Sequence, residues 1–181
     1  MKKSHFFISK GRNVKIISIV LIVVALSLSY YIYNLRAGHS SVPYVVPALS
    51  KPYTNSKYHF SLMLPDDFTV SESFMNGRDT IVFQNSKSEG IQITISPYDD
   101  IKVLTADMIE KELPDMKVSD AEPVEIGMYN KGVAFRSDND AFDRASREVW
   151  FVFDSKLYQI STYERFDKLL QKMFETWRFT L

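Results

Sequence analysis

A charge-free stretch, residues 16–35, sets the strongest limit on what this chain can form. Twenty residues at a helical rise of about 1.5 Å span about 30 Å, which is the thickness of the hydrocarbon core of a bilayer. Tyr30, Tyr31 and Tyr33 lie near the end of this stretch. Aromatic rings of this kind favour the level of the lipid headgroups. The sequence therefore predicts a transmembrane helix over 16–35.

Charged residues are divided unevenly between the two sides of this stretch. Residues 1–55 hold seven of the 22 basic residues and none of the 22 acidic ones, so the other 15 basic residues share residues 56–181 with all 22 acids. The two parts carry formal charges of +7 and −7. Five of the cations form a basic arm, residues 1–15, directly before the span, a pattern that keeps this flank in the cytoplasm. We therefore expect a cell-membrane protein with a cytoplasmic N-terminus and an extracytoplasmic C-terminal domain.

Composition argues against several classes of function. Binding to nucleic acid depends mainly on Lys and Arg that neutralise phosphates, so an acidic C-terminal part is a poor partner for it. The chain has no cysteine, which excludes disulfides, thiolate chemistry, a sulfur-based zinc site and a lipoprotein anchor. No cofactor is expected.

The charge-free stretch has a second interpretation as the apolar region of a cleaved signal peptide. Such regions typically hold about 7 to 15 apolar residues followed by a small-x-small cleavage site. This stretch is longer, and its best site would be Ser27 to Ser29. An uncleaved anchor is favoured, with a secreted binding protein as the alternative.

Residues 36–56 show neither a helical nor a strand pattern. They contain Pro43, Pro47 and Pro52 among Ser, Gly and Asn. Proline at this density favours an extended, semi-rigid chain. The sequence predicts a stalk over 36–56 that holds a folded domain, residues 57–181, away from the membrane.

Short strands dominate the pattern of 57–181. Phe60, Leu62 and Leu64 alternate along one predicted strand, and Asn76 and Gly77 form a strong hairpin-turn signal. Further strands are predicted at 70–74, 80–84, 91–96, 123–128, 133–136, 147–154 and 157–163. The strand at 147–154 contains VWFVF, which is apolar on both faces and therefore indicates a central strand covered from two sides.

Two helices are predicted among these strands. Thr105 can cap a helix over 106–113, whose Met108, Ile109 and Leu113 would face the sheet. The second helix carries an apolar stripe at helical spacing, formed by Phe166, Leu169, Leu170, Met173, Phe174 and Trp177. Hairpin links between the strands predict an α+β sandwich with an antiparallel sheet and two helices.

Three segments of this domain resemble the PsbP-like fold. They are YHFSLMLPDDF at 58–68, REVWFVFDSKLYQIS at 147–161 and FDKLLQKMFETWRF at 166–179. That fold includes the extrinsic protein of photosystem II and many uncharacterised bacterial envelope proteins. The resemblance implies an antiparallel α+β sandwich outside the cytoplasmic membrane, and it implies no catalytic residue in this chain.

One acidic loop offers weak candidate sites. Asp138, Asp140 and Asp143 could hold a hard cation such as calcium, but their spacing departs from the EF-hand pattern and a solvated loop is favoured. Phe142 stands among these acids. Such a ring either tucks back onto the core, which we favour, or contacts a partner, since aromatic residues are enriched at the centres of interfaces.

The function expected from these patterns is binding rather than catalysis. The sequence groups no residues into a catalytic constellation, so no enzymatic activity is predicted. We expect a single-pass anchored domain that contacts the lipid bilayer through 16–35 and binds another envelope protein or supports an assembly. The alternative is an anchored envelope hydrolase whose site the sequence does not reveal.

Overall fold

The computed structural model describes residues 44–99, 104–128 and 130–180. None of the helices within these residues is long and apolar enough to cross a membrane. The predicted basic arm, the predicted span and residues 36–43 of the predicted stalk lie outside the described residues.

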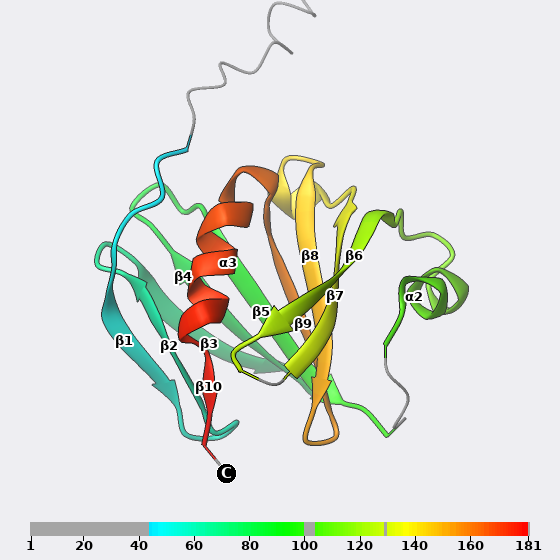
Figure 1. Ribbon diagram of the computed structural model, residues 1–181, viewed down its shortest axis with the longest axis horizontal. Coiled ribbons are helices and arrows are strands. Elements are labelled where there is room, and N and C mark those ends of the chain that lie inside the picture. Colours follow the sequence, from blue (N-terminus) through cyan, green and yellow to red (C-terminus); the bar gives the residue numbers. More distant parts are fainter. Residues whose placement is uncertain (1–43, 100–103, 129, 181) are drawn as a thin grey trace, which may run out of the picture. The chain divides into compact units, whose positions relative to one another are not determined.

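The domain is an antiparallel α+β fold with two helices, as the sequence predicted for this part of the chain (Figure 1). Its strands form two sheets, whereas the sequence predicted one. The smaller sheet has the order β1-β2-β10, formed by Leu49–Asn55, Phe60–Pro65 and Arg178–Phe179. The larger sheet has the order β3-β4-β5-β9-β8-β7-β6. Its strands are β3 Thr69–Met75, β4 Arg78–Gln84, β5 Gly90–Pro97, β6 Ser119–Ile126, β7 Asn130–Ser137, β8 Ser146–Phe153 and β9 Lys156–Tyr163. The helices are α2 Ala106–Glu112 and α3 Asp167–Thr176.

The main core lies between one face of the larger sheet, the smaller sheet and α3 (Figure 1). Phe60, Leu62 and Leu64 alternate along β2 and are buried in this core. The predicted apolar stripe of the last helix is confirmed, because all six of its residues are buried. Phe166 precedes the α-helix in the short 3-10 helix η2, Glu164–Phe166, and Trp177 caps its C-terminal end. A continuous stripe thus runs from η2 through α3 to its C-cap residue.

Helix α2 covers the other face of the larger sheet. Ile109 packs with Phe135 of β7 and Trp150 of β8, and the Thr105 side chain accepts a hydrogen bond from the Met108 amide. The predicted cap and the inward position of Ile109 are confirmed. Leu113, by contrast, is 42% exposed. The helix ends at Glu112 and Leu113 leaves helical geometry (φ −127°, ψ 68°), so its side chain does not continue the inner face of α2.

The predicted boundary between stalk and domain at residue 57 is corrected by the structure. Residues 49–55 form β1, which pairs antiparallel with β2, and Leu49 and Tyr53 pack against the core. The proline pattern suggested an irregular chain, but Pro52 is tolerated because β1 is an edge strand with only one neighbour. The folded unit begins at Tyr44, so the part of the predicted stalk that the structure describes belongs to the domain.

Candidate functional site

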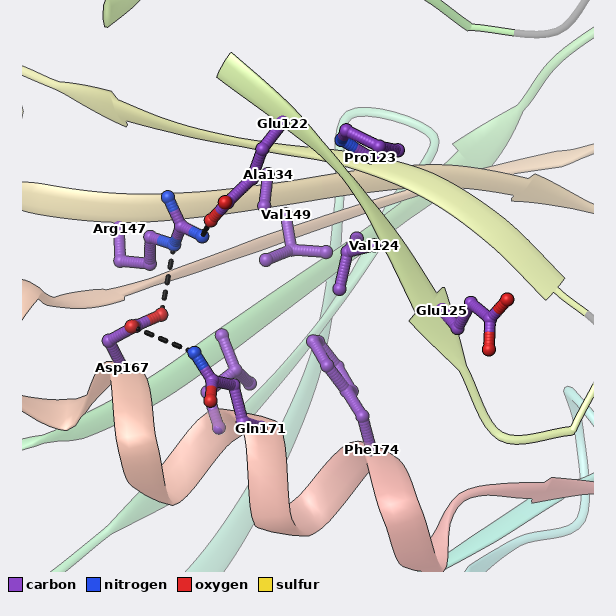
Figure 2. A pocket seen from close by; sticks show the side chains of 11 residues that line it. Glu122, Pro123, Val124, Glu125, Ala134, Arg147, Val149, Asp167, Gln171 and Phe174 are labelled. Atoms are coloured by element: carbon purple, nitrogen blue, oxygen red, sulfur yellow. Dashed lines mark hydrogen bonds and ion pairs between the residues drawn. The ribbon is translucent and has the colours of Figure 1, made fainter. Parts of the chain in front are cut away.

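A cleft of about 270 Å³ lies between α3 and strands β6, β7 and β8 (Figure 2). Its apolar lining comes from Val124, Ala134, Val149, Leu170 and Phe174. Its polar side chains are Glu122, Glu125, Arg147, Asp167 and Gln171. The cleft therefore combines an apolar floor with a polar, charged wall, which is the usual composition of a small-ligand site.

Arg147 is the most deeply placed charge of this cleft. It is the second residue of β8, and its side chain is only 8% exposed. The guanidinium contacts the Glu122 carboxylate of β6 through Nη2, and its Nε lies 2.9 Å from Asp167 Oδ1 of α3 (Figure 2). Burying a charge costs several kcal/mol unless partners offset the lost hydration. These two carboxylates supply the offset, and the pairs join β6 and α3 to β8.

Asp167 has a second partner on its own helix. Gln171 Nε2 donates a hydrogen bond to Asp167 Oδ2 at 3.0 Å, so both carboxylate oxygens of Asp167 are engaged. Asp167 is also the first residue of α3, where a negative charge is stabilised by the helix dipole. The polar wall is therefore held in place by contacts from three elements before any ligand enters.

The charges of the cleft determine what it can accept. Glu122, Glu125, Arg147 and Asp167 together carry a formal charge of −2, and the Glu122 side chain remains 59% exposed at the rim. A ligand with one positive or hydrogen-bond-donating group could approach Glu122 while an apolar part contacts Val149 and Phe174. Arg147 already pairs with one carboxylate oxygen of Glu122 and one of Asp167. These pairs hold both acids in fixed positions, which suits them to binding a ligand.

A second buried charge, Glu148, lies beside Arg147 on the opposite face of β8. Glu148 is 1% exposed, and its Oε2 accepts a hydrogen bond from Ser161 Oγ at 2.5 Å. Its buried Oε1 has no hydrogen-bond partner among the described residues. Sequence reasoning missed both charges, because Arg147 and Glu148 stand at the start of an apolar strand, where charges usually mark an exposed end. Two adjacent charges before VWFVF were the one available signal.

A third polar cluster lies near the β3–β4 hairpin. Asp79 of β4 accepts hydrogen bonds from Lys57 Nζ at 2.8 Å and from Tyr58 Oη at 2.5 Å. Burial raises the pKa of the Asp79 carboxyl, but these hydrogen bonds and the Lys57 charge outweigh burial, so the pKa lies below its usual value. Burial and the bond to Asp79 raise the pKa of Tyr58. The cluster ties the β1–β2 turn to β4.

The acids predicted as weak metal ligands face separate cations. Asp138 pairs with Lys117 at 3.3 Å, Asp140 with Arg144 at 3.1 Å, and Asp143 with Arg165 at 3.9 Å. In the described part of the chain, no three His, Cys, Asp or Glu side chains come together in a way that could hold a metal ion. The structure does not bring the three predicted ligands into one site.

Phe142 occupies the inward position that the sequence favoured. It lies in the 3-10 helix η1, Asp140–Phe142, is 7% exposed, and packs edge-to-face on Tyr163 with ring centroids 5.3 Å apart. Contact with a partner would require an exposed ring at this position. The structure therefore assigns Phe142 a packing role in the described domain.

Comparison with known proteins identifies the fold. No known family model matches the chain, and no curated protein matches it. Among solved structures, the chain is similar to the solution structure of cyanobacterial PsbP (CyanoP) from Synechocystis sp. PCC 6803, with a TM-score of 0.52 and 16% identity. The similarity covers 78% of this chain and 99% of that chain. At this identity the similarity shows the fold alone. The domain has a PsbP-like fold.

Proposed function

We propose that this chain is a single-pass membrane-anchored protein whose PsbP-like domain lies outside the cytoplasm and acts as a non-enzymatic binding or accessory domain. The observation that carries the proposal is the charge-free stretch 16–35 directly after five cations. The acidic domain that follows has its own core and its own cleft. We infer that the cleft around Arg147 receives the ligand or a side chain of the partner protein.

Single cysteines at two positions test the orientation. The chain has no cysteine, so Ser4→Cys and Ser71→Cys each create a unique thiol, and Ser71 is exposed on β3. A membrane-impermeant maleimide should label only the Ser71→Cys chain in intact cells, because Ser4 is proposed to lie in the cytoplasm. Permeabilised cells, in which both variants should react, provide the control. Labelling of Ser4→Cys or protection of Ser71→Cys in intact cells would contradict the topology.

The secreted alternative is separated by the size of the cellular protein. An uncleaved anchor predicts that the chain recovered from cells migrates with the full-length chain on a denaturing gel. Cleavage near Ser29 predicts co-migration with a chain that begins at Tyr30, and recovery from the medium rather than from membranes.

Filling the cleft tests whether it binds a ligand. Val124 lines the cleft and is half-buried, so Val124→Trp should occupy the space while leaving the Arg147 pairs in place. The matched control is Ala121→Trp, because Ala121 is exposed on the same strand and is not among the residues that line the cleft. A ligand at 100 times its Kd stabilises a protein by about 2.7 kcal/mol. Small amines with an apolar chain that raise the melting temperature of the wild type should fail to stabilise Val124→Trp and should stabilise Ala121→Trp as they do the wild type.

Equal stabilisation of both tryptophan variants would place the bound amine elsewhere. If no amine in the panel stabilises the wild type, the cleft does not serve this ligand class, and the anchored topology is judged separately by the maleimide experiment.

A further inference from the structure

Strand β3 is an outer strand of the larger sheet, and one side of its backbone is free. The β3–β4 hairpin has a two-residue turn in which Asn76 and Gly77 both have positive φ, 53° and 76°. In such a turn the flanking residues, Met75 and Arg78, hydrogen-bond to each other. Alternate residues of β3 therefore direct their N–H and C=O groups away from β4. These residues are Val70, Glu72 and Phe74, and no described residue hydrogen-bonds to their backbone groups.

The two outer strands of this sheet differ in protection. Strand β6, at the other side, contains Pro123, a register shift between Ser119 and Glu122, and exposed acids. Proline, bulges and charges are the usual devices that prevent pairing with another strand. Strand β3 pairs with β4 in unbroken register over seven residues and contains neither proline nor Lys or Arg. Its free side is open to a further strand.

Side chains along β3 indicate what kind of strand would fit. Val70, Glu72 and Phe74 alternate on one face, while Ser71 and Ser73 on the other face are small. Glu72 is the single charged residue of β3, and its Oε1 accepts a hydrogen bond from Tyr53 Oη at 2.6 Å. Phe74 at the hairpin end is 66% exposed, and Lys57 Nζ lies 5.3 Å from its ring centroid. An added strand would complement this pattern with a basic residue opposite Glu72, apolar residues on either side of it, and small polar residues on its other face.

We propose that the free side of β3 is a docking site for an extended segment of another protein, which joins the larger sheet as an additional antiparallel strand. Backbone hydrogen bonds to Val70, Glu72 and Phe74 would supply affinity, and the apolar-basic-apolar pattern would supply selectivity.

A second copy of the chain fits this surface less well. Tyr44, the first described residue, stacks on Phe166 with ring centroids 4.6 Å apart, and the neighbouring Arg165 pairs with Glu89 of the β4–β5 turn at 2.9 Å. Tyr44 therefore lies at the opposite end of β4 from the β3–β4 hairpin. Antiparallel pairing of two β3 strands would place the two Tyr44 residues at opposite ends of the dimer. Two copies anchored in one membrane, as proposed, would need both Tyr44 residues on the same side. The choice of a different protein as the partner therefore rests on the proposed anchoring.

A synthetic peptide can probe the docking site directly. The probe has seven residues, with threonine at the odd positions, valine at the second and sixth, and lysine at the fourth. Labelled with fluorescein, it is titrated with the full-length chain in detergent solution, and its anisotropy gives the Kd. Methylation of the backbone nitrogens at the second, fourth and sixth residues should weaken binding at least tenfold, because these N–H groups face β3. The same modification at the third and fifth residues faces solvent and should leave binding within about threefold.

Two variants of the protein provide the matching control. Glu72→Pro removes an outward N–H that is not used in the β3–β4 pairing, together with the hydrogen bond that Glu72 accepts from Tyr53 Oη. Its melting temperature should therefore match that of Glu72→Ala, which loses the same hydrogen bond, while the peptide binds at least tenfold more weakly than to the wild type. Glu72→Ala keeps the N–H and loses the charge, and should weaken binding about two- to fivefold, as expected for an exposed ion pair.

The proposal is overturned if the unmodified peptide does not bind, or if methylation at the β3-facing positions has no effect. If Glu72→Pro does not fold, the comparison between peptides methylated at the β3-facing and at the solvent-facing positions still tests the proposal. Sedimentation of the chain alone completes the test: a dimer that Glu72→Pro disperses would show that β3 pairs with a second copy, which overturns the assignment of a different partner. Failure of the anchoring itself would be seen in maleimide labelling and not in peptide binding.

Discussion

Replacement of Trp177 with alanine is expected to lower the free energy of unfolding by about 3 to 5 kcal/mol, the usual cost of truncating a buried large aromatic residue. Trp177 is 1% exposed at the end of α3. Its ring stacks on Phe60 of β2 with centroids 4.5 Å apart and meets Phe151 of β8 edge-on at 5.8 Å. One side chain thus joins the last helix to both sheets. Domains of this size are typically stable by about 5 to 15 kcal/mol, so the loss is a large fraction of the total.

Urea unfolding followed by circular dichroism measures this loss as a shift of the midpoint. Two variants bracket the result. Phe74→Ala removes a ring that is 66% exposed and should change stability by no more than about 0.5 kcal/mol. Trp177→Phe keeps an aromatic ring in the stack and removes an indole N–H that has no hydrogen-bond partner among the described residues, so it should cost less than the alanine variant. A midpoint for Trp177→Ala equal to that of Phe74→Ala would contradict the packing.

The elements predicted correctly from sequence are those whose local pattern and tertiary contacts agree. The stripe from Phe166 to Trp177 forms the inner face of α3 and its flanks because helical spacing alone places its side chains on one side. Asn76 and Gly77 form the hairpin turn because both positions require positive φ. In these cases no information from distant parts of the chain was needed.

The elements missed from sequence are those that depend on a distant partner. Strand β1 contains Pro52 and shows only weak alternation, and it forms because β2 lies beside it. Strand β10 has two residues, Arg178 and Phe179, which become a strand only by pairing with Ser61 and Phe60. Neither segment is long or regular enough to be recognised without its neighbour.

The candidate cleft could not be predicted for the same reason. Arg147 meets Glu122, 25 positions earlier in the chain, and Asp167 in the following helix. Each of these residues alone has the pattern of an exposed charge, and only the crossing of β6 and α3 over β8 brings the two carboxylates to the buried Arg147 guanidinium. Sequence reasoning instead selected Asp138, Asp140 and Asp143, which are close in the chain but face different cations.

The second large effect concerns the cluster around Arg147. Removal of its two carboxylate charges should destabilise the domain more than removal of the Arg147 charge. Arg147 is 8% exposed, whereas the side chains of Glu122 and Asp167 are 59% and 35% exposed. Removing both carboxylate charges with Glu122→Gln and Asp167→Asn leaves a buried guanidinium without a counter-charge. This should cost about 3 to 5 kcal/mol, the range for breaking a buried ion pair from one side.

Removing the cation instead leaves two carboxylates that water can reach. Arg147→Met also replaces the guanidinium with an apolar side chain of similar reach, so this variant should cost about 1.5 to 3 kcal/mol, the net worth of hydrogen bonds to a charged group. Urea midpoints of the two variants, measured under the same conditions, give the comparison. If Arg147→Met is the more damaging change, the carboxylates are shielded from water and the cleft is too closed to admit a ligand. The expected order, with the double carboxylate variant less stable, corresponds to a buried cation behind an accessible acidic rim, as a binding cleft requires.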